Sequence, residues 1–181
     1  MSQSTWTSDF SKLAPNPLLG ATSTVDIQRL SHYFDQHWPN VRLQLISEQF
    51  ETAFPEETAC FETVHTEFWV RKIFLCSDET PLSFARVVVP KATYLRFQNA
   101  FEQLKTKPIG ETLLHHNPDV TRHPFEYRFL EKNDLLSKDM QHTYAHLEVP
   151  GWARRSLFTW AGFPLLITEV FLFQTQVASC L

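Results

Sequence analysis

Two pairs of segments, each joined by a short turn, constrain the fold of this chain more than any other feature. The pairs comprise residues 67–76 with 81–89, and residues 154–160 with 164–173. Runs rich in aromatic and β-branched side chains on both sides of a turn predict antiparallel β-hairpins. Ala161-Gly162 separates the second pair, and glycine supplies the backbone geometry that a tight turn requires. The sequence therefore predicts a sheet built around two long hairpins.

The remaining segments predict a few more elements around these hairpins. We expect strands at 41–45 and 125–130, helices at 25–37 and 90–104, and a helical turn within 107–114. Residues 51–66 are expected to form an irregular connection, and the charged residues 131–149 a surface excursion. Residues 1–22 are expected to form a loose leader. One α+β domain then remains at 23–181, with its helices to one side of an antiparallel sheet.

The composition argues against several classes of protein. The 181 residues carry a net charge of −4, which leaves no basic excess for the phosphates of a nucleic acid. Three cysteines without CxxC spacing argue against a disulfide framework and a zinc ribbon. The sequence shows no signal-peptide pattern, and no apolar stretch approaches the ~20 residues that cross a bilayer. We therefore expect a cytoplasmic protein and, because no apolar pattern extends beyond the core, a monomer.

Two charged residues stand on strand faces that are otherwise apolar. Because side chains alternate along a strand, Arg71 shares its face with three large apolar neighbours, and Glu169 stands in a similar row. The rows are Trp69, Ile73 and Leu75 beside Arg71, and Leu165, Ile167, Phe171 and Phe173 beside Glu169. Burying an isolated charge costs several kcal/mol, so both residues need partners.

Two interpretations of these charges stay open on the residue pattern alone. In the first, Arg71 and Glu169 pair with each other, or reach water at a sheet edge. In the second, both line a ligand pocket. The guanidinium then receives a substrate carboxylate through two parallel hydrogen bonds. The carboxylate of Glu169, held in an apolar wall, favours its protonated form and can handle a proton.

Other polar residues are weaker candidates for a functional site. Arg154 and Arg155 are neighbours on one strand, so at most one of them faces a pocket, and a solvent-exposed arginine is the simpler interpretation for either. His115, His116 and His123 lack the spacing of a metal site, which predicts surface histidines. The sequence contains no phosphate-binding or dinucleotide fingerprint.

Four blocks in series resemble the chorismate pyruvate-lyases of bacteria. FWVRKIFLC and FARVVVP, at 68–76 and 84–90, are similar to the W-x-R-E-x-x-L-C and A-R-x-x-x-P pair of that family. LKTKPIGETLL at 104–114 is similar to its LGxxPLGxxLF element. GWARRSLFTWAGFPLLITEVFLF at 151–173 is similar to its WxRRS…PLLxTExFLP ending. The order and spacing of the blocks agree over roughly residues 25–173.

The resemblance implies both a fold and a reaction. The family cleaves chorismate to 4-hydroxybenzoate and pyruvate for ubiquinone synthesis. It implies a six-stranded antiparallel sheet with helices packed on one side, a product site closed to solvent with slow product release, no metal and no organic cofactor. Carried over by position, Arg71, Ile109 and Glu169 contact the substrate, Ile109 through its backbone N–H, and Leu30 matches a position that is usually Met. Arg71 and Glu169 are then the catalytic residues.

Two other functions compete with this hypothesis. Effector-binding domains of some bacterial transcription regulators resemble the same fold and sense small molecules without catalysis. They are normally fused to a DNA-binding helix-turn-helix, for which we expect the residues before 25 to be too few. The remaining alternative is a scaffold domain, in which Arg71 and Glu169 pair with each other and no pocket exists.

Overall fold

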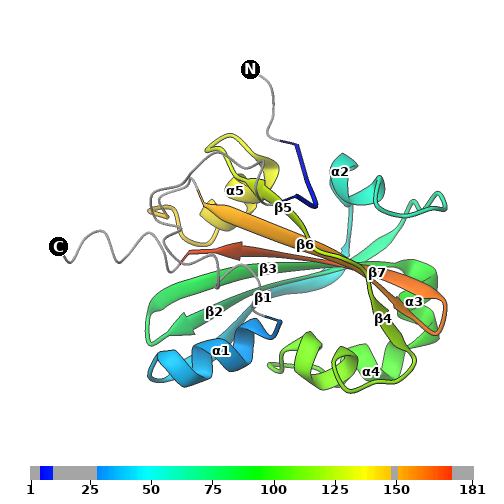
Figure 1. Ribbon diagram of the computed structural model, residues 1–181, viewed down its shortest axis with the longest axis horizontal. Helices are drawn as coiled ribbons and strands as arrows, with labels where there is room; N and C mark the ends of the chain where they lie inside the picture. The colour runs from blue at the N-terminus through cyan, green and yellow to red at the C-terminus, as the bar shows by residue number, and fades with distance from the viewer. Residues whose placement is uncertain (1–4, 10–27, 148–150, 173–181) are drawn as a thin grey trace.

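A computed structural model describes residues 5–9, 28–147 and 151–172 of the chain (Figure 1). The strands in this part are β1 Val41–Glu51, β2 Phe68–Ser77, β3 Thr80–Pro90, β4 Val120–Arg122, β5 Glu126–Phe129, β6 Trp152–Trp160 and β7 Phe163–Phe171. The helical segments are α1 Leu30–His37, α2 Pro55–Thr58, α3 Lys91–Arg96, α4 Gln98–Glu102, the π-helical turn η2 Gly110–Leu114, and α5 Leu135–Gln141. No helix among these is long and apolar enough to cross a membrane.

The described strands form one antiparallel sheet in the order β1-β2-β3-β7-β6-β4. β4 pairs with the end of β6 and β5 with its beginning, so these two short strands share the sixth position. Pro124 lies between them, and proline has no N–H to donate to a strand ladder. The α+β class and the antiparallel sheet are therefore confirmed, whereas the predicted count of six strands becomes seven in the described residues.

Both predicted hairpins are present, as β2 with β3 and β6 with β7. Ala161 and Gly162 join β6 to β7 with positive φ angles of 46° and 86°. A turn of this hand matches the twist of the paired strands, and glycine adopts it without steric cost. The two-residue turn also fixes the register of the hairpin. Arg154, seven residues before Ala161, pairs with Glu169, seven residues after Gly162.

Helices cover both faces of the sheet, which corrects the prediction of helices on one side (Figure 1). α1 buries Leu30 and Phe34 against one face. α5 buries Leu136 and Met140 against the opposite face. The prediction of a surface excursion at 131–149 is therefore wrong for α5. Lys138 is exposed, whereas Asp139 points inward to Lys72 and Arg86. Two apolar residues spaced four apart complete the buried face of the helix.

A buried ion-pair cluster ties the helices of the second face to the sheet. Arg86 of β3 is fully buried and donates hydrogen bonds to Glu57 at 2.7 Å, Glu51 at 2.8 Å and Asp139 at 2.9 Å. Glu57 lies on α2, within the connection that was predicted to be irregular. Burial raises the pKa of Glu57, against the opposing effect of Arg86. Lys72 of β2 lies 2.9 Å from Glu51 and 2.9 Å from Asp139, so three carboxylates meet two cations in this cluster.

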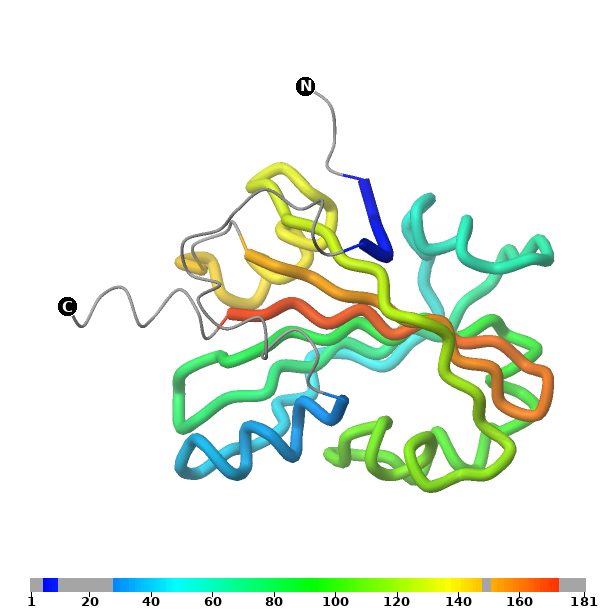
Figure 2. Tube along the Cα trace, in the orientation of Figure 1, coloured from blue at the N-terminus to red at the C-terminus, as the bar shows by residue number. Residues whose placement is uncertain are grey.

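Residues 5–9 run beside β5, the yellow-green strand of Figure 2. Thr7 and Tyr127 exchange two backbone hydrogen bonds, of 3.0 and 2.8 Å. The indole ring of Trp6 lies 4.9 Å and 4.4 Å from the guanidinium carbons of Arg128 and Arg155. This short segment therefore packs on the edge of the sheet. The predicted boundary between leader and domain at residues 22 and 23 lies outside the described residues and stays a prediction.

Candidate active site

The face of the sheet that carries α1 encloses a cavity of about 70 Å³. Alternate residues of four neighbouring strands make its floor, and the segments around α1, η2 and β4 make its walls. The floor consists of Arg71, Ile73, Leu75, Ser83, Ala85, Val87, Arg154, Ser156, Phe158, Ile167 and Glu169. The walls consist of Gln28, Leu30, Ser31, Pro108, Ile109, Gly110, His115, Arg122 and Phe125. The four site residues named from the sequence, Leu30, Arg71, Ile109 and Glu169, thus line one cavity.

Arg71 and Glu169 do not pair with each other. Arg71 stands opposite Val87 on β3, and Glu169 stands opposite Ala85. Two strand spacings and a rise of two residues place the Cα atoms of Arg71 and Glu169 about 12 Å apart. The small side chain of Ala85 leaves space above the floor between the two charges. The scaffold interpretation, in which the pair closes a solid interior, is therefore contradicted.

The guanidinium of Arg71 is held in place by three acceptors. Its side chain is 1% exposed, and it donates to the Glu48 carboxylate and to the backbone carbonyls of Lys105 at 2.7 Å and Lys107 at 3.0 Å. Burial lowers the pKa of Arg71, while Glu48 opposes the shift. The three bonds use three of the five N–H groups of the guanidinium. A ligand carboxylate can bind the remaining two or exchange with Glu48.

Glu169 has a cationic partner, which corrects the prediction of an apolar wall around it. The Nε of Arg154 donates to Glu169 Oε2 at 2.6 Å, and the Arg154 side chain is 1% exposed. The guanidinium carbon of Arg154 lies 4.3 Å from the ring centroid of Phe125 and 5.3 Å from that of Phe171. The prediction of a solvent-exposed Arg154 is wrong. The hydrogen bond from its guanidinium orients the Glu169 carboxylate, whose oxygens can accept a hydrogen bond from a ligand.

Ile109 precedes η2 on the wall that faces Arg71. The first N–H groups of a helix lack acceptors within the helix, so this backbone is suited to a ligand oxygen. In the π-turn, the His115 N–H donates to the Gly110 carbonyl at 2.8 Å. A Cβ on Gly110 would lie 2.8 Å from His115 Nε2, so glycine is required for this close packing. His115 lines the cavity, which corrects its predicted surface position, and burial lowers its pKa.

Leu30 closes the cavity on the opposite wall. It is the first residue of α1 and is 4% exposed, in contact with the apolar cluster around Ile73 and Leu75. Residues 25–27 of the predicted helix lie outside the described residues. An apolar wall of this kind excludes water, which strengthens the electrostatic contacts of a bound ligand.

Three charged groups at this site were not predicted from the sequence to belong to it: Glu48, Arg122 and Arg154. Glu48 lies on β1 beyond the predicted strand, where a bulge between Leu45 and Ser47 interrupts the alternation. Arg122 lies on β4, which is too short to show a period. Arg154 could have been found, because the predicted turn already places it opposite Glu169.

Neither a metal site nor an activated thiol is found in the described residues. No three His, Cys, Asp or Glu side chains converge there as a metal ion would require. Burial raises the pKa of both Cys60 and Cys76, which disfavours the nucleophilic thiolate. A reaction without a metal or organic cofactor stays a prediction.

Comparison with known proteins gives consistent matches. The family model described as chorismate lyase matches residues 2–179. The chorismate pyruvate-lyase of Erwinia tasmaniensis is 30% identical over 164 residues, covering 87% of this chain and 82% of that protein. The chorismate pyruvate-lyase of Photorhabdus laumondii is 29% identical over 176 residues, covering 95% and 90%. A possible transcriptional regulator of Bacillus subtilis aligns in structure with a TM-score of 0.48 and 14% identity, over 73% of this chain and 57% of that one. This last likeness is too low to bear on fold or function.

Proposed function

The chain belongs to the chorismate lyase family, and we propose that it eliminates pyruvate from chorismate to give 4-hydroxybenzoate. One observation carries the proposal: a single cavity has Arg71 and Glu169 set apart along its floor, each held by its own partner. In the proposed reaction Arg71 and Glu169 are the catalytic residues. Leu30 and Ile109 complete the substrate-binding site.

The chemistry of chorismate fits a site of this kind. The ring carries a carboxylate, a hydroxyl on the opposite ring carbon, and an enolpyruvyl ether on the carbon beside the hydroxyl. Loss of the proton from the hydroxyl-bearing carbon and rupture of the ring carbon–oxygen bond make the ring aromatic. The departing enolpyruvate keeps the electron pair of that bond and takes up a proton to become pyruvate. Because aromatisation drives the reaction, the site needs positioning and modest proton transfer rather than a covalent nucleophile.

Each end of the cavity has a role in the proposed mechanism. Arg71 binds the ring carboxylate with its remaining N–H groups, supported by the backbone N–H of Ile109. The hydroxyl donates a hydrogen bond to Glu169, which accepts the ring proton and returns it to the enolpyruvate. Leu30 excludes water from the apolar side of the ring. The hydrogen bond from Arg154 holds the Glu169 carboxylate in position for this contact.

Further parts of the proposal follow the family rather than the cavity. They are the use of 4-hydroxybenzoate for ubiquinone synthesis and a reaction without cofactor. A cytoplasmic location and a monomeric state rest instead on the sequence pattern and stay part of the proposal. A single experiment addresses the core of the proposal. The purified protein is mixed with chorismate, while 4-hydroxybenzoate is followed by its absorbance and pyruvate by a coupled assay. A sensor domain would bind 4-hydroxybenzoate without releasing pyruvate.

Two variants test the roles of the residues. Glu169→Gln is expected to lower kcat by about 10²-fold or more, the usual contribution of a positioned acid or base. Glu126→Gln, on the opposite face of the sheet, is the matched control. Arg71→Ala is expected to abolish tight binding of 4-hydroxybenzoate. Turnover unchanged in Glu169→Gln would remove Glu169 from the chemistry, and product affinity unchanged in Arg71→Ala would make Arg71 structural.

A further inference from the structure

Arg122 lines the cavity but has no carboxylate partner within residues 5–9, 28–147 and 151–172. It donates to the side-chain oxygen of Gln28, and its guanidinium carbon lies 4.4 Å from the ring centroid of Phe125. By contrast, Arg71 and Arg154 are each bonded to a glutamate. Among the described residues, the site therefore has three arginines but only two glutamates that pair with them, Glu48 and Glu169.

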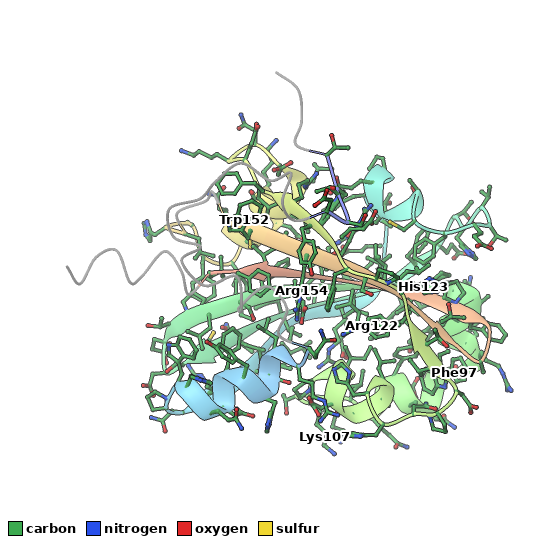
Figure 3. The ribbon with its side chains drawn as sticks, viewed as in Figure 1. Phe97, Lys107, Arg122, His123, Trp152 and Arg154 are labelled. Atoms are coloured by element: carbon green, nitrogen blue, oxygen red, sulfur yellow. The ribbon has the colours of Figure 1, made fainter. Side chains whose placement is uncertain are left out.

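Arg122 stands at the Glu169 end of the cavity. Phe125 receives the guanidinium of Arg154 at 4.3 Å as well, so the two arginines flank the same ring. Burial and the charge of Arg154 lower the pKa of Arg122, while Glu169 opposes the shift, as expected for three charges at close range. An arginine stays charged under these conditions. Both residues line the cavity, and their labels lie near each other in Figure 3.

The connectivity of chorismate places a second anion at this same end. Its enolpyruvyl ether and its hydroxyl are on adjacent ring carbons. If Arg71 holds the ring carboxylate and Glu169 the hydroxyl, the enolpyruvyl carboxylate must lie beside Glu169. A second carboxylate next to a glutamate would be repelled unless a cation neutralised it. Arginine suits that task because its planar guanidinium can donate two parallel hydrogen bonds to a carboxylate.

We propose that Arg122 binds the enolpyruvyl carboxylate of chorismate, an inference that rests on the proposed function. Arg154 stays committed to Glu169, and Phe125 holds both guanidiniums in place. Arg122 thereby recognises the part of the substrate that the aromatic product lacks. Arg122 also lines a second hollow, together with Gln28 and His115.

The substrate and the product provide an internal control for this proposal. Arg122→Gln is expected to lower kcat/KM for chorismate by about ten- to a hundredfold, as for a lost hydrogen bond between charged groups. The Kd of 4-hydroxybenzoate is expected to change less than about threefold, within the scatter of surface substitutions. Arg96→Gln is the matched control, because Arg96 also stacks on a phenylalanine, Phe97 at 5.7 Å, and does not line the cavity.

A second measurement uses binding alone. The probes are 3-carboxymethoxy-4-hydroxybenzoate, which carries a carboxylate beside the hydroxyl, and 3-methoxy-4-hydroxybenzoate, which does not. The wild type is expected to prefer the first, and Arg122→Gln is expected to lose that preference. Equal losses for substrate and product, or an unchanged preference between the probes, would overturn the role of Arg122. A wild type that releases no pyruvate would instead refute the proposed function, and the probe pair would still report on Arg122.

Discussion

Glu48 accepts a hydrogen bond from Arg71, so a ligand carboxylate bound to Arg71 as proposed would share that guanidinium with Glu48. This gives an unusual expectation. Glu48→Gln keeps an oxygen that can accept the hydrogen bond from Arg71 but removes the negative charge. Without ligand, the variant leaves a guanidinium that is 1% exposed without its counter-charge. With ligand, the variant relieves repulsion between two carboxylates. We therefore expect lower stability together with tighter binding of 4-hydroxybenzoate.

The size of the effect follows from the distance between the charges. Two carboxylates bound to one guanidinium lie about 5 Å apart, where their repulsion is about 3 kcal/mol at a dielectric constant near 20 and about 0.8 kcal/mol in bulk water. Glu48 is 25% exposed, so water screens part of this repulsion. We expect about 1–2 kcal/mol, equivalent to a Kd lower by about five- to thirtyfold. The free energy of unfolding without ligand should fall by about 1–3 kcal/mol.

Titration calorimetry with 4-hydroxybenzoate and urea unfolding with and without that ligand measure both effects. The stability difference between variant and wild type should narrow when ligand is added, because tighter binding stabilises the folded state more. Glu79→Gln is the control, since Glu79 is 90% exposed and pairs with Arg42 on the surface. Weaker binding in Glu48→Gln would show that Glu48 only positions Arg71, and the competition argument would be refuted.

Three further changes probe the two faces of the sheet. Met140→Ala, on the face away from the cavity, should lower the free energy of unfolding by about 2–5 kcal/mol in urea while product affinity stays constant. Gly110→Ala should displace the ring of His115 and weaken 4-hydroxybenzoate binding, and an unchanged Kd would contradict the packing argument. His115→Gln tests pH dependence. Burial lowers the pKa of His115 from 6.5, so the unfolded chain binds the proton more readily. The free energy of unfolding of the wild type should therefore fall as the pH drops below about 6.5, and that of the variant should fall less. Identical stability profiles for wild type and variant across this pH range would contradict the role of His115.

The sequence predicts which face of the sheet each strand residue lies on, because side chains alternate between the two faces along a strand. Arg71 and Glu169 were placed on apolar rows by alternation, and the structure puts both rows on the cavity side. The turn at Ala161 and Gly162 also determined the register of β6 against β7. The position of Arg154 opposite Glu169 therefore follows from the turn alone.

The partners of these residues could not be predicted in the same way. Glu48 reaches Arg71 only because a bulge shifts the register of β1 against β2. Arg122 reaches the cavity from a strand of three residues, which carries no periodic signal. The carbonyls of Lys105 and Lys107 come from a connection between helical segments, where backbone direction depends on tertiary packing. Non-local contacts of this kind are set by the fold rather than by local patterns.

Arg71 and Arg86 show why the pattern of a strand alone cannot separate a binding arginine from a structural one. Both lie on central strands, and both are almost fully buried. Arg86 meets three carboxylates on its face of the sheet, so an added anion would find no charge left to neutralise. Arg71 meets one carboxylate and two carbonyls, which satisfy N–H groups without cancelling further charge. Among the described residues the cavity face, with Arg122 added, carries more arginines than carboxylates. In that part of the chain, this excess of positive charge distinguishes a face suited to anionic ligands from one that only holds helices in place.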